Sequence, residues 1–335
     1  MNGSTHPWRM SRLGAPGEEI AIFEAGASDP RAPAVLLIHG LGHWTEAAWE
    51  RILPHLDPRL RIVAFDLPGF GRSDRPDVPY DDRFFADTMT RVVAATMPRR
   101  FALVGHSLGG AIAARYAAAH PERLSRLVLV APAGFLRGVR YVYAALGTAP
   151  LQWLLHRRPS HHTIRWFKER TVADHRAIAP EMMERAYELA DDPGVRRAFA
   201  RVYATALREL AHADEIEARL RAWTGPTLLA WGRKDTLIPL RGIDDAARVY
   251  PQAEVAIFAW SGHVPMIEEP TGVGEQLNRF LSADIVSSPA HEKGPWWEAL
   301  LGRVMHKAAS RELGPKGTSA PVPPSRARRA PASSL

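Results

Sequence analysis

The sequence predicts an α/β fold with a mostly parallel central sheet, helices on both faces and an all-helical insertion. Three features of its 335 residues support this prediction. Short apolar runs alternate with helical patterns up to residue 130, and the alternation resumes at residue 226. Residues 133–221, between these stretches, contain helical patterns and no convincing strand. Strands that alternate with helices imply a parallel sheet joined by right-handed crossovers.

The first predicted strands lie within residues 19–65. Residues 19–24 alternate polar and apolar side chains, as an edge strand with one wet face does. Residues 34–38 form a continuous apolar run, which is typical of a strand buried on both faces of a parallel sheet. An amphipathic segment at residues 47–53 follows, and residues 61–65 form the next short strand before a turn rich in glycine and proline.

The remaining elements follow the same rhythm. Before the insertion we expect a helix, a strand, an alanine-rich helix and a buried strand, at residues 81–97, 101–104, 111–119 and 127–130. After it we expect a strand, a helix, a strand and a last helix, at residues 226–231, 243–249, 254–258 and 271–281. A helical insertion between two stretches of one sheet predicts a lid over the carboxyl ends of the strands, where such sheets bind ligands.

Composition and charge limit the function classes. The net charge is +7, but residues 291–335 hold eight Lys or Arg against three Glu, so the rest of the chain is nearly balanced. The high pI therefore gives no case for nucleic-acid binding. The chain has no cysteine, which excludes a disulfide framework, a thiol nucleophile and a cysteine metal site. No His/Asp/Glu spacing suggests a metal and no Gly-x-Gly-x-x-Gly suggests a nucleotide, so we predict neither metal nor cofactor.

The first residues, the longest uncharged run and the basic C-terminal extension bear on where the protein is located. The first residues lack the basic-then-apolar build of a signal peptide, and the longest uncharged run, residues 141–155, is shorter than the roughly 20 residues that span a bilayer. We therefore predict a cytoplasmic protein.

In the basic extension, residues 285–335, a short helix is expected over residues 295–308, followed by disorder from residue 314. This helix would dock on its own domain, lie on an anionic membrane or bind a partner. The sequence makes no prediction about the oligomeric state.

The segment that carries the chemistry is residues 101–110, an apolar strand that runs into Gly-His-Ser-Leu-Gly-Gly. A Gly-x-Ser-x-Gly between a strand and a helix predicts a nucleophile elbow, which presents the hydroxyl of Ser107 at the top of the sheet. The residues two positions to either side of the serine must be small, and here they are Gly105 and Gly109. The alternative is a glycine-rich turn with an ordinary capping serine.

A serine hydroxyl needs a base and a carboxylate that orients the base. In folds with a nucleophile elbow these partners follow in the order serine, acid, histidine. His263 follows the last predicted strand and is the expected base, and Asp235 follows the strand before it and is the expected acid. Asp66 precedes the serine within a turn, so we expect it to bind turn amides.

The oxyanion of an acyl-transfer reaction needs backbone donors already aimed at it. One is expected to be the amide of Leu108, directly after the nucleophile, and the other to come from the loop after strand 34–38. Gly40 and Gly42 in that loop let the backbone approach closely, so we choose the amide of Leu41. The alternative is a tight turn with no ligand role.

Five segments together resemble the α/β-hydrolase superfamily. They are His-Gly-Leu-Gly, Asp-Leu-Pro-Gly-Phe-Gly-Arg-Ser-Asp, Gly-His-Ser-Leu-Gly-Gly, Gly-Arg-Lys-Asp and Gly-His-Val-Pro-Met-Ile-Glu-Glu-Pro, which start at residues 39, 66, 105, 232 and 262. The resemblance implies the α/β-hydrolase fold, with a core at residues 1–132 and 222–284 and a helical cap at residues 133–221. It also implies a triad of Ser107, Asp235 and His263, with Leu41 and Leu108 as oxyanion donors.

The resemblance also narrows the reaction. Relatives that hydrolyse haloalkanes or epoxides have an aspartate at the elbow, so Ser107 implies acyl transfer from an ester, thioester or lactone to water. The meta-cleavage C–C hydrolases resemble this chain too, but carry a tryptophan after their histidine where this chain has Val264. Cofactor-free perhydrolases share the triad, and some members of this fold are non-catalytic ligand-binding receptors. We predict an ester hydrolase, with the C–C hydrolase as the alternative.

The expected substrate is a small apolar ester. Aromatic and apolar residues of the insertion favour an apolar acyl or aryl group, or else only pack the insertion onto the core; they are Tyr141, Tyr143, Trp153, Leu154, Leu155, Trp166 and Phe167. The predicted substrate contacts are His39, Gly40, His106, Trp153, Trp166, Phe167 and Val264.

Overall fold

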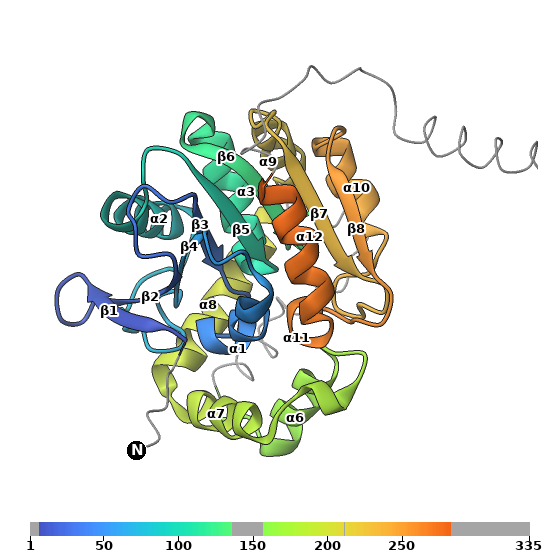
Figure 1. The fold of residues 1–335 in the computed structure, drawn as a ribbon. Helices are drawn as coiled ribbons and strands as arrows, with labels where there is room; N and C mark the ends of the chain where they lie inside the picture. The colour runs from blue at the N-terminus through green and yellow to red at the C-terminus, as the bar shows by residue number, and fades with distance from the viewer. Residues whose placement is uncertain (1–6, 136–156, 211, 283–335) are drawn as a thin grey trace, which may run out of the picture. The chain divides into compact units, whose positions relative to one another are not determined.

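An eight-stranded sheet forms the centre of the computed structural model, which describes residues 7–135, 157–210 and 212–282 (Figure 1). The strand order is β1-β2-β4-β3-β5-β6-β7-β8. The strands are β1 (Arg9–Leu13), β2 (Ile20–Gly26), β3 (Ala34–Ile38), β4 (Arg61–Phe65), β5 (Phe101–His106), β6 (Leu124–Val130), β7 (Thr227–Gly232) and β8 (Glu254–Phe258). β2 pairs antiparallel with β1 and β4, and the pairs from β4 through β3 to β8 are all parallel.

Strand β2 corrects the prediction of an edge strand at residues 19–24. It lies inside the sheet, and five of its first six residues are buried. The edge is formed by β1, which the sequence analysis missed because its Arg-Met-Ser-Arg-Leu sequence has no apolar pattern and is largely exposed. The polar side chains near β2 are accommodated by ion pairs, since Glu19 contacts Arg12 and Glu24 contacts Arg61.

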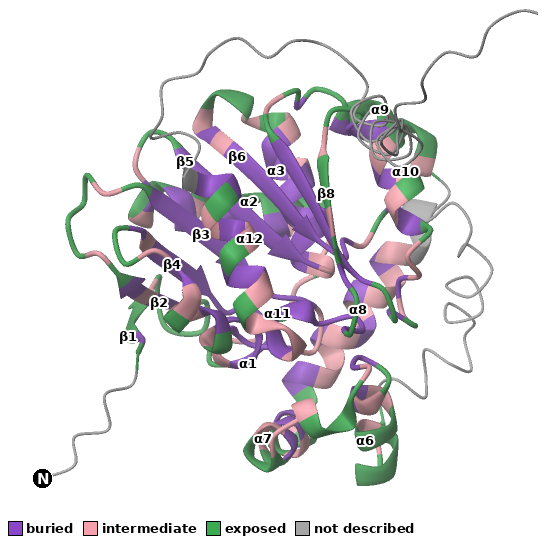
Figure 2. Cartoon of the chain, turned by 45° about the vertical axis from the view of Figure 1, so that its right-hand side comes forward, coloured by how far each residue is buried: buried purple, intermediate pink, exposed green. Residues whose placement is uncertain are grey.

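Helices cover both faces of the sheet (Figures 1 and 2). Strand β3 shows why both faces need cover: Leu36 and Ile38 join one apolar cluster, and Val35 and Leu37 join the other. One face carries α2 (Asp82–Thr96), α3 (Leu108–Ala119) and α10 (Gly242–Val249). The other carries α1 (Thr45–Trp49), the 3-10 segment η1 (Glu50–His55), α11 (Pro265–Glu268) and α12 (Pro270–Ser282).

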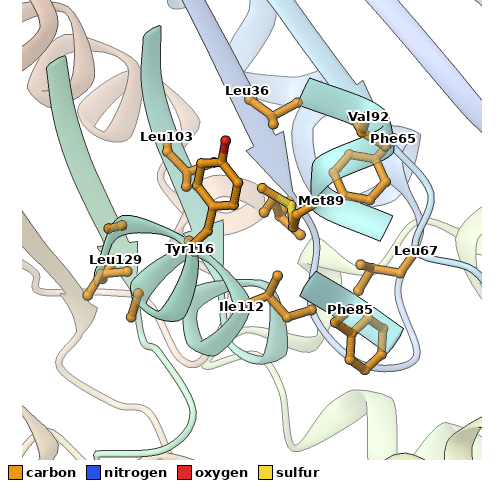
Figure 3. Close-up of a cluster of buried hydrophobic side chains, with 14 of the residues drawn as sticks. Leu36, Phe65, Leu67, Phe85, Met89, Val92, Leu103, Ile112, Tyr116 and Leu129 are labelled. Carbon is orange, nitrogen blue, oxygen red and sulfur yellow. The ribbon is translucent and has the colours of Figure 1, made fainter. Parts of the chain in front are cut away.

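The larger cluster fills the space between the sheet, α2 and α3 (Figure 3). Leu36, Phe65 and Leu103 from the strands meet Met89 of α2 and Ile112 of α3 there. Helix α3 packs closely on the sheet because alanines line its buried side, with Ala113, Ala114 and Ala117 completely buried. This close packing fixes the start of α3 relative to the end of β5.

The described residues between β6 and β7 contain four α-helices, which we call the insertion helices. They are α6 (His161–Glu169), α7 (Pro180–Asp191), α8 (Pro193–Leu210) and α9 (Ala213–Leu220). The described residues between β6 and β7 form no strand, as predicted. Among the predicted pocket residues, Tyr141, Tyr143 and residues 153–155 lie outside the described residues, as does the basic extension with its predicted helix at 295–308.

None of the described helices is long and apolar enough to cross a bilayer.

Candidate active site

Ser107 lies at the sharp turn between β5 and α3, with φ 51° and ψ −116°. This conformation is strained for a residue with a Cβ atom and is rarely found away from functional sites. Glycines make it possible, because a Cβ at Gly105 would collide with the carbonyl of Gly109, and a Cβ at Gly109 with the carbonyl of Ile38. The Ser107 side chain makes no capping hydrogen bond to α3, so the alternative of an ordinary capping serine does not hold.

Asp235 and His263 form a buried pair at the carboxyl ends of β7 and β8. Nδ1 of His263 lies 2.8 Å from Oδ2 of Asp235. The other carboxylate oxygen of Asp235 accepts the amides of Leu237 and Ile238, each at 2.9 Å, so the carboxylate is held in place. Because a carboxylate accepts, Nδ1 of His263 is the donor, which leaves Nε2 as the basic nitrogen.

His106 connects the nucleophile turn to the histidine loop. Its Nε2 donates to the carbonyl oxygen of His263 at 2.9 Å, and the two rings pack with centroids 4.8 Å apart. Burial, and the nearby His263, hold the pKa of His106 well below its usual value, so its ring is neutral. Since His106 directly precedes Ser107, this contact fixes the His263 loop against the nucleophile turn.

The loop after β3 lies directly against the serine. A Cβ at Gly40 would lie 3.0 Å from Cβ of Ser107 and 2.7 Å from Nδ1 of His106, so only glycine fits at this position. His39 holds the loop from beneath: its Nδ1 donates to the carbonyl of Gly40 at 2.8 Å, and its Nε2 accepts the amide of Leu67 at 2.9 Å. His39 is completely buried, so it supports the loop and the prediction of a substrate contact is corrected.

The two expected oxyanion donors border the serine from different elements. Leu108 is the first residue of α3, where backbone amides have no partner within the helix. Leu41 lies in the loop that Gly40 brings against Ser107. Asp66 ties this loop to the next one, because Oδ1 accepts the amide of Thr45 and Oδ2 that of Arg72, each at 2.7 Å. The prediction that Asp66 binds turn amides is therefore confirmed.

Lys168 reaches this loop from insertion helix α6, and the sequence analysis missed it. Its Nζ donates to the carbonyl of Gly42 at 2.8 Å and lies 5.6 Å from the ring centre of Trp44. The side chain is buried, and burial lowers the pKa of Lys168 to about 8. Nothing in the local sequence distinguishes this lysine from an exposed helical one, because its partners are more than 120 residues away.

Glu268 is a second residue that the sequence analysis did not single out. Its carboxylate accepts the amides of Ala173 at 2.6 Å, Asp174 at 3.0 Å and Gly262 at 2.7 Å. It thus joins the segment after α6 to the residue before His263. The amide of His263 donates to the carbonyl of Thr171 at 2.7 Å, which strengthens the same junction. The position of the expected base therefore depends on the insertion.

The other predicted contacts fall in different environments. Phe167 is half-buried and meets the ring of Phe199 edge-on at 6.3 Å, and Phe199 in turn lies against Gly42. Trp166 is 57% exposed and stacks under the guanidinium of Arg170, so its position does not support a substrate contact. Val264 is buried in the apolar cluster beneath α11 and α12, which gives it a packing role instead. Trp153 lies outside the described residues.

Comparisons with known proteins identify the fold family of the chain. The family model of the alpha/beta hydrolase fold matches residues 33–270. The 2-hydroxymuconate semialdehyde hydrolase of Pseudomonas sp. (strain CF600) is 30% identical over 80% of this chain and 92% of its own length. The pimeloyl-[acyl-carrier protein] methyl ester esterase of Aeromonas hydrophila is 29% identical over 75% of this chain and 96% of its own.

A solved structure supports the same fold. The 2-hydroxy-6-oxo-6-phenylhexa-2,4-dienoate hydrolase of Rhodococcus sp. strain RHA1 is similar with a TM-score of 0.70 and 24% identity, over 82% of this chain and 98% of its own. The family match spans strands β3 to β8 and the insertion between β6 and β7. The chain belongs to the α/β hydrolase fold family.

Proposed function

We propose that the protein is a serine hydrolase that cleaves carboxylic esters, or the related thioesters and lactones, through an acyl-enzyme on Ser107. The observation that supports this most is the strained backbone of Ser107, which glycines make possible, at a turn that His106 ties to the loop of His263, the partner of Asp235. Strain of this kind persists only where the surrounding structure enforces it, and it is common at catalytic residues. This backbone at a strand-to-helix turn supports Ser107 as the nucleophile, and a serine at this turn, where other members have an aspartate, favours acyl transfer.

In the proposed mechanism Oγ of Ser107 attacks the ester carbonyl while Nε2 of His263 takes its proton. Asp235 holds the imidazole in the required tautomer and stabilises the imidazolium that forms. The amides of Leu41 and Leu108 stabilise the oxyanion. His263 then protonates the leaving alcohol, and a water activated by the same histidine releases the acid from Ser107.

We propose that the insertion helices act as the cap and select an apolar group next to the scissile bond. Phe167 and Phe199 form an aromatic contact close to Gly42, and Tyr203 extends it, with its ring centre 5.1 Å from that of Phe199. These rings would border a substrate bound at Ser107. Esters with medium or long acyl chains are therefore expected to react faster than acetates.

The second candidate is a C–C bond hydrolase of the meta-cleavage type. The similarity to the 2-hydroxymuconate semialdehyde hydrolase favours it as much as the similarity to the methyl ester esterase favours ester cleavage. Val264, where such C–C hydrolases carry a tryptophan, weakens this candidate. Both reactions would use Ser107, Asp235 and His263.

Hydrolysis of a p-nitrophenyl ester series from acetate to long acyl chains tests the proposal. Ser107→Ala is expected to remove at least about 10³-fold of the rate, while Ser11→Ala on exposed strand β1 should leave it unchanged. If the folded protein cleaves no ester, the ester hydrolase is wrong and a vinylogous 1,5-diketone acid becomes the substrate to test.

A further inference from the structure

Lys168 is a buried cation near the nucleophile, and no carboxylate of the described residues pairs with it. Burial accounts for the lowering of its pKa, and no acidic group opposes that effect. Its Nζ uses one of three N–H donors on the carbonyl of Gly42. Two donors of a desolvated ammonium therefore have no hydrogen-bond partner among the described residues.

The acidic groups near this position are already occupied. Both oxygens of Asp66 accept backbone amides, those of Thr45 and Arg72. Asp235 binds His263 through Oδ2 and two amides through Oδ1. Neither carboxylate pairs with Lys168, so the described residues supply no anion for this cation.

His43 provides a second unpaired polar group beside Lys168. It is buried, and within the part of the chain that the structure describes neither of its ring nitrogens has a hydrogen-bond partner. Burial comes first among the causes that hold the pKa of His43 well below its usual value, followed by the charge of Lys168. The ring is therefore neutral, and one of its nitrogens is a free N–H donor.

The ring of His106 fixes the place of this pair relative to the nucleophile. It meets the ring of His43 edge-on at 6.0 Å, and its Nδ1 is also unpartnered. Because Nε2 of His106 donates to the carbonyl of His263, Nδ1 is an acceptor and does not bind an anion. Nδ1 of His106 lies next to Gly40, and Gly40 lies against Ser107. Lys168 and His43 are therefore close to the bond that Ser107 would attack.

We propose that Lys168 and His43 form a carboxylate subsite, so that the preferred substrate carries an anionic group a few atoms from the bond that Ser107 attacks. An isolated buried charge and buried unpaired donors are both destabilising. A carboxylate that accepts from Nζ of Lys168 and from the N–H of His43 removes both penalties at once. The inference rests on the proposed function and adds to it the chemical class of the substrate.

Matched ester pairs test the subsite. One pair compares mono-p-nitrophenyl adipate with p-nitrophenyl hexanoate, which places the charge on the acyl side. The other compares 4-acetoxybenzoate with its methyl ester, which places the charge on the leaving group. In one of the two pairs, Lys168→Met is expected to lower the charged-to-neutral ratio of kcat/KM about 10- to 100-fold. That pair then identifies the side of the ester that carries the charge.

The charged-to-neutral ratio of kcat/KM distinguishes two effects of Lys168→Met: the loss of anion recognition and the loss of the contact between Lys168 and Gly42. A loss of that contact would slow charged and neutral esters alike and leave both ratios unchanged, which would overturn the proposal. Arg165→Met is the matched control, since it removes an exposed positive charge from the same helix. If Arg165→Met changes the ratio as much as Lys168→Met does, the effect is one of general charge and the subsite is wrong.

A binding measurement keeps the inference independent of turnover. Isothermal titration calorimetry with adipate is expected to show binding to the wild-type protein and a roughly tenfold or greater weakening in Lys168→Met. Equal binding by both proteins, or none by either, contradicts the subsite. If adipate binds through Lys168 but no ester is cleaved, the subsite stands and the proposed ester hydrolysis fails.

Discussion

Nδ1 of His263 lies 2.8 Å from Oδ2 of Asp235, although 28 positions separate the two residues in the chain. The contact follows from the sheet, because β7 and β8 are parallel neighbours and their carboxyl ends bring the two following loops together. The loops after β7 and β8 would not meet in this way if either strand were reversed. The pair thus depends on the fold and defines which nitrogen of His263 is free to act as a base.

Replacing Asp235 with Asn tests the role of this pair. Asn keeps the size of the side chain but presents an amide to a ring that needs an acceptor for its Nδ1–H. We expect kcat for p-nitrophenyl esters to fall by about 10³-fold or more. Asp244→Asn, at an exposed position in the first turn of α10, is the control and should retain full activity. A loss of less than tenfold in Asp235→Asn would contradict the assigned role.

Gly109 tests the packing that strains Ser107. A Cβ at this position would collide with the backbone of Ile38, so Gly109→Ala is expected to lower the free energy of unfolding by about 2–3 kcal/mol and to displace the serine. In Gly272→Ala the added Cβ would lie 3.7 Å from the ring of Phe258, an ordinary contact. That control should change the free energy of unfolding by less than about 1 kcal/mol. Urea denaturation of both variants measures the difference, and equal effects would refute the steric argument.

Lys168 predicts a pH dependence of stability. Its pKa is about 8 in the folded protein, below the ordinary 10.5, so between these pH values the unfolded chain binds more protons than the folded one. Its contribution to stability therefore rises as the pH increases from 8 to 10.5 and is least favourable below 8. The melting temperature of Lys168→Met minus that of the wild type is expected to decrease over this range. A difference that stays constant or increases with pH would contradict the buried position of the charge.

Glu268 tests the junction between the insertion and the His263 loop. Gln has one acceptor oxygen and turns an NH2 group toward backbone donors, so Glu268→Gln should lower the free energy of unfolding by about 1–3 kcal/mol. We also expect a lower kcat, because the loop that carries His263 loses its anchor. Glu254→Gln, at a half-exposed position on β8, is the control. Unchanged kcat and stability in Glu268→Gln would show that Glu268 does not position the loop.

Much of the fold could be predicted because buried parallel strands have a strong apolar signal. Strands β3, β4 and β8 have the bounds that were expected, and the helices around them differ by one to three residues at their ends. The predictions failed at β1, which was missed, and at β2, which was expected at the edge of the sheet. The polar and apolar pattern of these strands depends on partners elsewhere in the chain. Paired charges such as Glu24 with Arg61 let an internal strand look like an edge strand.

The candidate site also contains residues with a local sequence signal and residues that depend on distant partners. Ser107 could be predicted as the nucleophile because its turn needs glycines at fixed spacing, and Asp235 and His263 as its partners because topology sets their order and strand ends. Lys168 could not be found, since only the fold brings α6 to the carbonyl of Gly42. The burial of Val264 could not be predicted for the same reason: its place in the motif is visible in the sequence, but its packing in the core is not. The triad roles, the cap and the cytoplasmic location remain predictions.

The central claim is that Ser107 is the nucleophile and that His263 activates it. Its most direct test is intact-mass spectrometry after treatment with a fluorophosphonate, followed by peptide mapping of the labelled residue. The reagent forms a phosphorus–oxygen bond with an activated serine and releases fluoride. We expect one adduct, located on Ser107, with none in Ser107→Ala and much slower labelling in His263→Ala. A folded protein that takes up no label, or takes it up on another residue, would contradict the account.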